Sequence, residues 1–274
     1  MIVENGLAAY AAGKLVADNG VYRIYLCEEM ASERQCLLQV ATETKHNGAL
    51  DRSAYLLREL ARVSEVVDAA YAASKSNPDK RLGYDKLFPE LVDSFISLQQ
   101  GERRLNVLAF RNVKDVSDMV PLANLASKDR LRVDLRTSAW IMGRLLKLLG
   151  LVHNEGIAAR NLSGGNILLE PAKHYAVVFD WSTAQLYSGE VPKEERAEDI
   201  KQAARVVIAA LGGQVVDGYI PDIHDAVRPY TDYLLRLAEG HESNAEKAHH
   251  KFYELVDGLW ERKYYKFTTM PLSG

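Results

Sequence analysis

Residues 153–182, with the sequence HNEGIAARNLSGGNILLEPAKHYAVVFDWS, are the stretch that decides the fold. This stretch is predicted to contain a helix end, a polar loop and two short apolar strands, at 167–169 and 176–179, joined through a turn that contains Pro171. Asn166 stands just before the first strand and Asp180 just after the second. Because a hairpin brings these two ends together, an amide oxygen and a carboxylate could share one divalent cation.

The stretch resembles the catalytic loop and the metal-binding loop of the protein-kinase-like fold. In that family His-x-x-Gly-Ile leads into a loop that begins His-Arg-Asp-Leu and ends Asn-Ile-Leu, and then into a strand that ends at Asp-Phe-Gly. Here HNEGI at 153–157 matches the entry, ARNLSGGNIL at 159–168 matches the loop, and DWS at 180–182 stands at the third motif. The resemblance implies an α+β fold with two lobes. Residues 1–110 would form a small β-rich lobe with one long helix, and residues 111–274 a mainly helical lobe.

The residues at the catalytic positions differ from those of the family. The catalytic Asp of the family accepts or orients the proton of the attacking hydroxyl, whereas Asn161 stands at this position. A neutral amide cannot act as a base near neutral pH. The strand position of the phosphate-binding Lys is Gln39; Lys45 lies beyond the strand, and a solvated loop lysine is its plainer interpretation. The phosphate-binding loop keeps only Gly20, next to Asp18, so a simple β-turn is favoured there.

The resemblance also implies roles for residues around the loop. His153 is expected to be a structural, hydrogen-bonding histidine, and Arg160 to be structural or regulatory. Asp199 begins a predicted helix and resembles the acid that braces the catalytic-loop backbone in the family; the alternative is an ordinary acid at a helix N-terminus. Only 19 positions separate Asp180 from Asp199, with no Ala-Pro-Glu motif between them. The segment that presents peptide substrates in protein kinases is therefore predicted to be short or absent.

Hydrophobic periodicity predicts the remaining elements. Residues 7–40 are expected to form a β-meander. The predicted strands outside the hairpin cover residues 21–27, 34–40, 91–97 and 104–110. The predicted helices cover residues 51–75, 133–152, 199–211, 225–240 and 244–261. Asp51 is the predicted N-cap of the first of these helices.

The composition is typical of a globular protein, with 274 residues, 47% hydrophobic and 26% charged. A net charge of −3 gives no bulk attraction to nucleic acid or to an anionic membrane. No apolar run approaches the ~20 residues of a membrane span, and the N-terminal residues lack the basic region of a signal peptide. A cytoplasmic protein is therefore expected. Cys27 and Cys36 are expected to be reduced thiols, as is usual in a cytosolic protein. A zinc site is not expected, because no second Cys or His pair follows at ligand spacing.

Three functions are compatible with these residues. The first, which is favoured, is a catalytically impaired kinase-like protein, a pseudokinase that acts as a regulatory or protein-binding module in signalling. It rests on the losses at Asn161, at Gln39 and in the glycine loop. The second is an active, atypical phosphotransferase or nucleotidyltransferase that uses Asn166 and Asp180. The third is a scaffold that binds no nucleotide.

The favoured interpretation leans against an enzyme and implies a protein partner, without identifying it. ATP and Mg²⁺ are the candidate cofactors, and the alternative is no cofactor at all. Gly20, Gln39 and Lys45 are the candidate nucleotide contacts, and Asn166 and Asp180 the candidate metal ligands.

Overall fold

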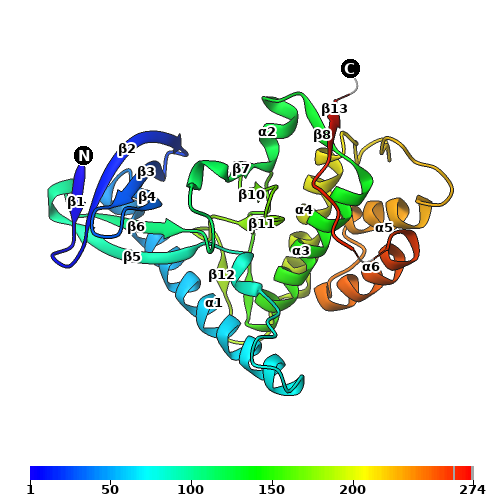
Figure 1. Cartoon of the computed structure of the whole chain (residues 1–274), viewed down its shortest axis with the longest axis horizontal. Coiled ribbons are helices and arrows are strands. Elements are labelled where there is room, and N and C mark those ends of the chain that lie inside the picture. Colours follow the sequence, from blue (N-terminus) through cyan, green and yellow to red (C-terminus); the bar gives the residue numbers. More distant parts are fainter. Residues whose placement is uncertain (262, 273–274) are drawn as a thin grey trace. The chain divides into compact units, whose positions relative to one another are not determined.

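The computed structural model describes residues 1–261 and 263–272. The chain has the predicted α+β architecture, with an antiparallel sheet toward the N-terminus and mainly helices toward the C-terminus (Figure 1). Its internal contacts divide it into two compact units. The first unit consists of Met1–Met119 and Asp180–Thr183, and the second of Val120–Phe179 and the chain from Ala184 onward. The last three residues of the stretch at 153–182, together with Thr183, thus belong to the first unit.

The first unit contains a six-stranded antiparallel sheet in the order β1-β2-β3-β4-β6-β5. Its strands are β1 (Ile2–Glu4), β2 (Ala9–Asp18), β3 (Tyr22–Glu29), β4 (Arg34–Ala41), β5 (Glu90–Ser97) and β6 (Arg103–Ala109). The strands predicted in this region are confirmed. Cys27 and Cys36 lie opposite each other on β3 and β4 as buried, free thiols. Between β2 and β3 the predicted turn forms, with Gly20 at a φ of +81°, where a glycine is unstrained.

Alternation along β4 sends its side chains to two faces of the sheet. Leu38 and Val40 pack with Leu105 and Val107 in one apolar cluster. Gln39 points to the other face, on which helix α1 (Asn47–Ser74) packs. There Asn106 Nδ2 of β6 donates a hydrogen bond of 2.9 Å to the Leu50 carbonyl of α1.

Helix α1 begins earlier than predicted. A 3-10 turn, Thr44–His46, leads directly into the helix, and His46 occupies the N-cap position. The assignment of Asp51 as N-cap is wrong, because Asp51 lies inside the helix and pairs with Arg104 at 3.0 Å. Leu50 explains the difference: it is fully buried against Tyr22 and Ala41, so the helical turn that carries it is held on the sheet.

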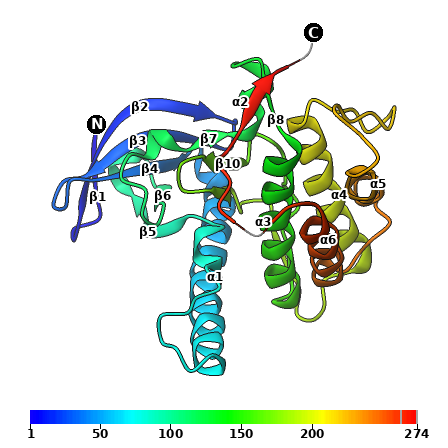
Figure 2. The same ribbon diagram turned by 45° about the vertical axis from the view of Figure 1, so that its right-hand side comes forward.

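The second unit is built around helix α3 (Leu135–Asn154), which packs against α4 (Lys193–Ala210) and α6 (Ala245–Leu259) (Figure 2). Helices α2 (Leu122–Ser127) and α5 (Arg228–Glu239) complete the set. Asp134 caps α3 by accepting from the Thr137 N–H at 2.7 Å. The predicted helices of this region are confirmed except at one end. Helix α4 begins at Lys193, so Asp199 lies in its second turn and is not an N-terminal acid.

Short strands complete the second unit. They are β7 (Val120–Pro121), β8 (Leu131–Val133), β9 (Ile157–Ala158), β10 (Ile167–Glu170), β11 (Tyr175–Val178), β12 (Gln185–Leu186) and β13 (Thr269–Pro271). β10 and β11 form the predicted hairpin, and β7 adds a third strand along β10. β9 pairs with β12, and β8 pairs with β13.

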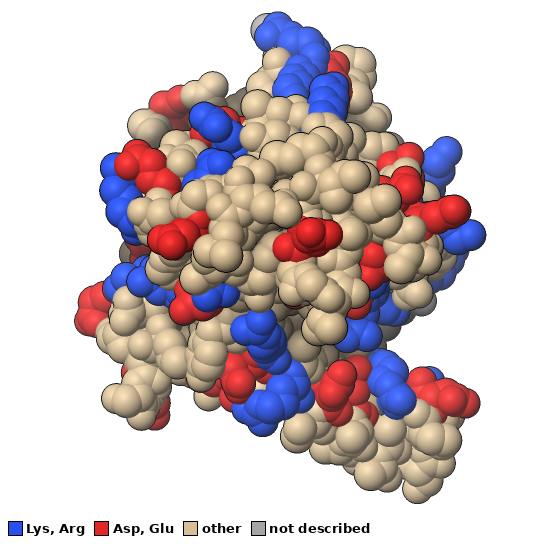
Figure 3. All heavy atoms as spheres, turned by 90° about the vertical axis from the view of Figure 1, so that its left-hand side faces the viewer, with Lys and Arg blue, Asp and Glu red and all other residues tan. Residues whose placement is uncertain are grey.

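The surface of the described chain mixes charged and apolar side chains. On the face shown in Figure 3, Lys and Arg are interspersed with Asp and Glu among uncharged residues. In the described part of the chain, no helix combines the length and the apolarity needed to cross a bilayer.

Candidate functional site

The polar loop at residues 159–166 lies between β9 and β10 and is held by helix α4. Asp199 is almost completely buried, and its two carboxylate oxygens accept from the N–H of Ala159 at 2.8 Å and the N–H of Arg160 at 2.7 Å. One turn further along α4, Gln202 Oε1 accepts from the Leu162 N–H at 3.1 Å. Side chains three residues apart share a helix face. One face of α4 therefore fixes the backbone at the start of the loop.

His153, at the end of α3, adds a third bond to the same carboxylate. Its Nε2 lies 3.0 Å from Asp199 Oδ2, and both side chains are buried. With its proton on Nε2, the imidazole donates to Asp199. A buried carboxylate needs such donors, because burial without partners disfavours its charged form. Asp199 thus joins the end of α3, the start of the loop and helix α4.

Arg160 has a left-handed backbone, with a φ of +60°, which is uncommon for a residue other than glycine. Its guanidinium makes hydrogen bonds to two residues: Nε donates to Glu195 Oε2 at 2.9 Å, and Nη2 donates to the Tyr187 hydroxyl at 3.0 Å. These hydrogen bonds from Arg160 lower the pKa of the Glu195 carboxyl. A backbone of this kind persists only where surrounding contacts determine it, as the bonds from Asp199 and Glu195 do here.

Asn161 lies next in the loop and is partly exposed. Its Oδ1 accepts from the Ser163 hydroxyl at 3.0 Å. Its backbone carbonyl accepts from Asn166 Nδ2 at 2.7 Å, so the amide of Asn166 ties the end of the loop to its middle. Neither amide can take a proton from a substrate near neutral pH. The loop is therefore a fixed scaffold without a general base at this position.

Asp180 belongs to the first unit and is also buried. Its Oδ1 accepts from the Ser182 N–H at 2.8 Å, and its Oδ2 from the Ser182 hydroxyl at 3.0 Å. Burial, together with the charge of Asp180 and a hydrogen bond to it, raises the pKa of the Tyr22 phenol. The segment is held further by Arg52 of α1, whose Nη1 donates to the Ser182 carbonyl at 2.8 Å. The Asp180 carboxylate is thus occupied by neighbours from its own unit.

The hydrogen bonds of the Asp180 carboxylate bear on the predicted metal site. Asp180 would have to give up bonds from Ser182 or Tyr22 to ligate Mg²⁺. The Phe179 N–H donates to the Asn166 carbonyl at 3.0 Å, but Asn166 belongs to the second unit and Asp180 to the first. Within residues 1–261 and 263–272, no group of three or more His, Cys, Asp and Glu side chains is placed to hold a metal ion. A metal ion shared by Asn166 and Asp180 stays a prediction.

The candidate nucleotide contacts lie in different environments. Gly20 is exposed at the tip of the β2–β3 turn. Lys45 is exposed as well, and its ammonium pairs with Glu43 at 3.0 Å. Gln39, by contrast, is 0% exposed. A nucleotide site that uses all three stays a prediction, and the Glu43 pair leaves Lys45 as an ordinary solvated lysine in this structure.

Gln39 is unusual because its side-chain amide is buried without support. Within the described residues, neither Oε1 nor Nε2 has a hydrogen-bond partner. Its cross-strand neighbour Asn106 does not serve as one, because the Asn106 amide is used by the Ser94 hydroxyl at 2.7 Å and by the Leu50 carbonyl. A buried polar group without a partner destabilises the folded state. Gln39 is therefore expected to make the folded state less stable than an apolar residue of similar size would at this position.

Replacing Gln39 by Leu is expected to raise the free energy of unfolding by about 1–3 kcal/mol, because it removes an unsatisfied amide and keeps a similar volume. Urea unfolding followed by far-UV circular dichroism measures this change. Gln35→Leu is the matched control, since Gln35 lies on the same strand and is exposed. It should stay within about 0.5 kcal/mol of the unmodified chain. A Gln39→Leu variant less stable than the Gln35→Leu control would show that the amide is supported.

Several residues of the site lie outside the sequence motif, which does not identify them. Glu195 and Gln202 flank Asp199 at helical spacing, so a correct start for helix α4 would have placed all three on one face. Tyr22 and Arg52 reach Asp180 and Ser182 across more than 100 residues of sequence, and no local pattern indicates such contacts. The chain matches no model of a known protein family and no curated protein.

Proposed function

We propose that the chain is a two-lobed, protein-kinase-like protein that has lost phosphoryl transfer and acts as a regulatory, protein-binding module. The observation that carries this proposal is the bracing of the loop at 159–166. Asp199 holds the backbone of Ala159 and Arg160 and the ring of His153, as the resemblance of the sequence to the kinase-like fold implies. The position that this bracing would present to a substrate is Asn161, which has no base chemistry.

Other groups that phosphoryl transfer needs are missing as well as the general base. Catalysis of phosphoryl transfer depends mainly on positioning and on charge that stabilises the transferring group. The strand position that should supply a cation is the neutral, buried Gln39. Lys45 is exposed and paired with Glu43, and Asp180 is engaged by Ser182. These features favour an impaired protein over an active, atypical phosphotransferase.

A binding role is supported by the surface of the first unit. Large apolar side chains are exposed on strands and turns of this unit, and an interaction surface would use such residues where they adjoin one another. They are Ile2, Leu7, Leu15, Val16, Met30, Ile96 and Leu98. A protein partner that presents an apolar surface fits these side chains best.

The Asn161→Asp variant tests the proposal directly. If only the base were missing, this substitution would raise phosphotransfer by roughly 10²–10⁴-fold. We expect no rise above the background of the unmodified chain, because the charge deficit at Gln39 remains. The measurement is ATP consumption and transfer of labelled phosphate to the chain or to a generic acceptor. Asn77→Asp, in an exposed turn, is the control for the added charge.

Two outcomes would overturn this assignment. Phosphotransfer by the unmodified chain would make it an active phosphotransferase. A clear gain in Asn161→Asp, absent from Asn77→Asp, would show that a cation reaches the phosphates. A thermal-shift series with ATP and ADP, with and without Mg²⁺, separates the alternatives further. A Mg²⁺-dependent shift that Asp180→Ala abolishes would support the metal role of Asp180, and no shift at millimolar nucleotide would favour the nucleotide-free scaffold.

A further inference from the structure

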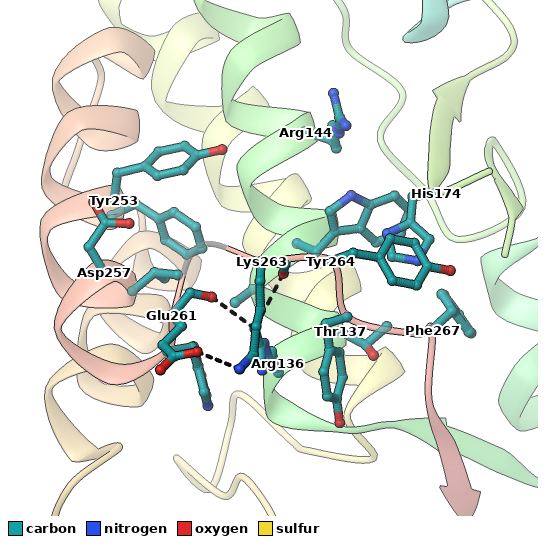
Figure 4. A pocket seen from close by; sticks show the side chains of 16 residues that line it. Arg136, Thr137, Arg144, His174, Tyr253, Asp257, Glu261, Lys263, Tyr264 and Phe267 are labelled. Carbon is teal, nitrogen blue, oxygen red and sulfur yellow. Dashed lines mark hydrogen bonds and ion pairs between the residues drawn. The ribbon is translucent and has the colours of Figure 1, made fainter. Parts of the chain in front are cut away.

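The second unit contains a pocket that the proposed function does not use. It lies between α3, α6 and the residues Trp260, Glu261 and 263–267, and the turn between β10 and β11 closes one side (Figure 4). Its volume is about 280 Å³, just below the ~300–1,000 Å³ of pockets for drug-sized ligands. The pocket therefore fits a small molecule.

Aromatic rings form its walls. His174 stacks on Tyr264 with ring centres 4.8 Å apart, and Trp140 lies 5.0 Å from His174. Phe267 meets Trp140 edge-on at 6.2 Å. The opposite wall comes from α6 and the residue after it, with Phe252, Tyr253, Val256 and Trp260. A lining with so many aromatic side chains favours a flat, apolar ligand.

Most charged groups at the pocket already have partners. Arg136 lies 4.3 Å from the centre of the Tyr265 ring and donates to the Glu261 carbonyl at 2.9 Å. The Glu261 carboxylate pairs with the Lys263 ammonium. The hydrogen bonds and the ion pair among these contacts are drawn as dashed lines in Figure 4. The charged side chains at this end of the pocket are therefore paired without a bound ion.

Arg144 is the exception. It projects from α3 at the end of the pocket away from Arg136, on the side of Tyr253 and His174 (Figure 4). Within the described residues it makes no ion pair or hydrogen bond. Its surroundings are unfavourable for a cation: burial lowers the pKa of Arg144, and burial together with the charge of Arg144 lowers the pKa of His174. The guanidinium nevertheless stays charged at neutral pH, with five N–H donors in a planar fork.

We propose that this pocket binds a small, planar aromatic carboxylate. The rings of Trp140, His174 and Tyr264 would hold the flat body, and Arg144 would take the carboxylate through two parallel hydrogen bonds, the geometry for which a guanidinium is suited. An aromatic pocket could also attract a cation through its ring faces. Here Arg144 repels a cation, so the end of the pocket at Arg144 favours an anion.

Three ligands of nearly equal shape test the proposal: 2-naphthoate, the neutral 2-naphthamide and the cation 2-naphthylmethylammonium. Binding to the purified chain is followed by calorimetry and by quenching of tryptophan fluorescence, since Trp140 and Trp260 line the pocket. We expect 2-naphthoate to bind best, and Arg144→Met to weaken it roughly 10- to 100-fold while leaving 2-naphthamide nearly unchanged. Arg228→Met, an exposed change on α5, is the control and should bind as the unmodified chain does.

The stability of Arg144→Met separates lost binding from lost folding. Removing a half-buried charge without a partner should leave the melting temperature unchanged or raise it. Equal or tighter binding of the cation would overturn the proposal, as would 2-naphthoate binding that survives Arg144→Met. Absence of 2-naphthoate binding to the unmodified chain at 1 mM would overturn it as well.

Discussion

Asp199→Ala is expected to lower the free energy of unfolding by about 3–5 kcal/mol. The substitution leaves the buried N–H of Ala159, the partly buried N–H of Arg160 and the His153 ring without their acceptor. It also releases the left-handed backbone of Arg160, whose strain only surrounding contacts maintain. Urea unfolding followed by far-UV circular dichroism measures the change.

The neighbouring acid provides the control for Asp199. Glu198 is on the same helix and about half exposed, and it pairs with Lys201 at 2.9 Å one turn away. Exposed pairs of this kind contribute about 0.3–0.5 kcal/mol, so Glu198→Ala should lie close to the unmodified chain. If Asp199→Ala lost less than about 1 kcal/mol, the carboxylate would not hold the loop, and the main support for the kinase-like proposal would be gone.

Trp181→Ala is expected to cost a similar amount, about 3–5 kcal/mol, because it removes a large side chain from a packed interior. Trp181 is 0% exposed and stands in the short segment Asp180–Thr183 that belongs to the first unit. Next to it, Arg52 of α1 donates to the Ser182 carbonyl. Loss of the indole should therefore destabilise the sheet and α1 rather than the helical unit. Circular dichroism is the suitable probe, since the substitution removes a fluorophore.

Two further variants show how large the effect of Trp181→Ala on the free energy of unfolding is. Trp181→Phe keeps a ring and should lose much less than the alanine variant. Tyr55→Ala, on α1 and half exposed, should change the free energy of unfolding by about 0.5 kcal/mol or less. An alanine variant of Trp181 as stable as Tyr55→Ala would mean that the first unit does not depend on this segment.

The elements of the fold followed from the sequence where apolar residues repeat. The strands of the first sheet, helix α3 and the β10–β11 hairpin all have such patterns, and the structure confirms them. The starts of α1 and α4 did not follow, because both begin in polar stretches. At α1 the burial of Leu50 against the sheet decides the start, and at α4 a polar first turn supplies Glu195 to Arg160. Such starts depend on tertiary contacts that periodicity does not show.

The candidate site was predictable to a smaller extent. Motif spacing alone singled out His153, Arg160 and Asp199, and the structure brings these three together. The environment of Asp180 did not follow from the sequence, because Tyr22 approaches it from a distant strand. Motif spacing likewise does not predict burial. Gln39 is buried, whereas Gly20 and Lys45 are exposed.

The return of the chain to the first unit at Asp180–Thr183 has a consequence for protein synthesis. A nascent chain that has left the ribosome as far as Met119 has its whole N-terminal sheet but lacks Trp181. Roughly 60 more residues must be added, which takes about 3–12 s at typical elongation rates. During this interval the edge strands β1 and β5 belong to an incomplete unit, and exposed strand edges are sites of aggregation. Slow elongation between these two points should therefore lower the yield of folded protein, and a chaperone that covers the sheet should restore it.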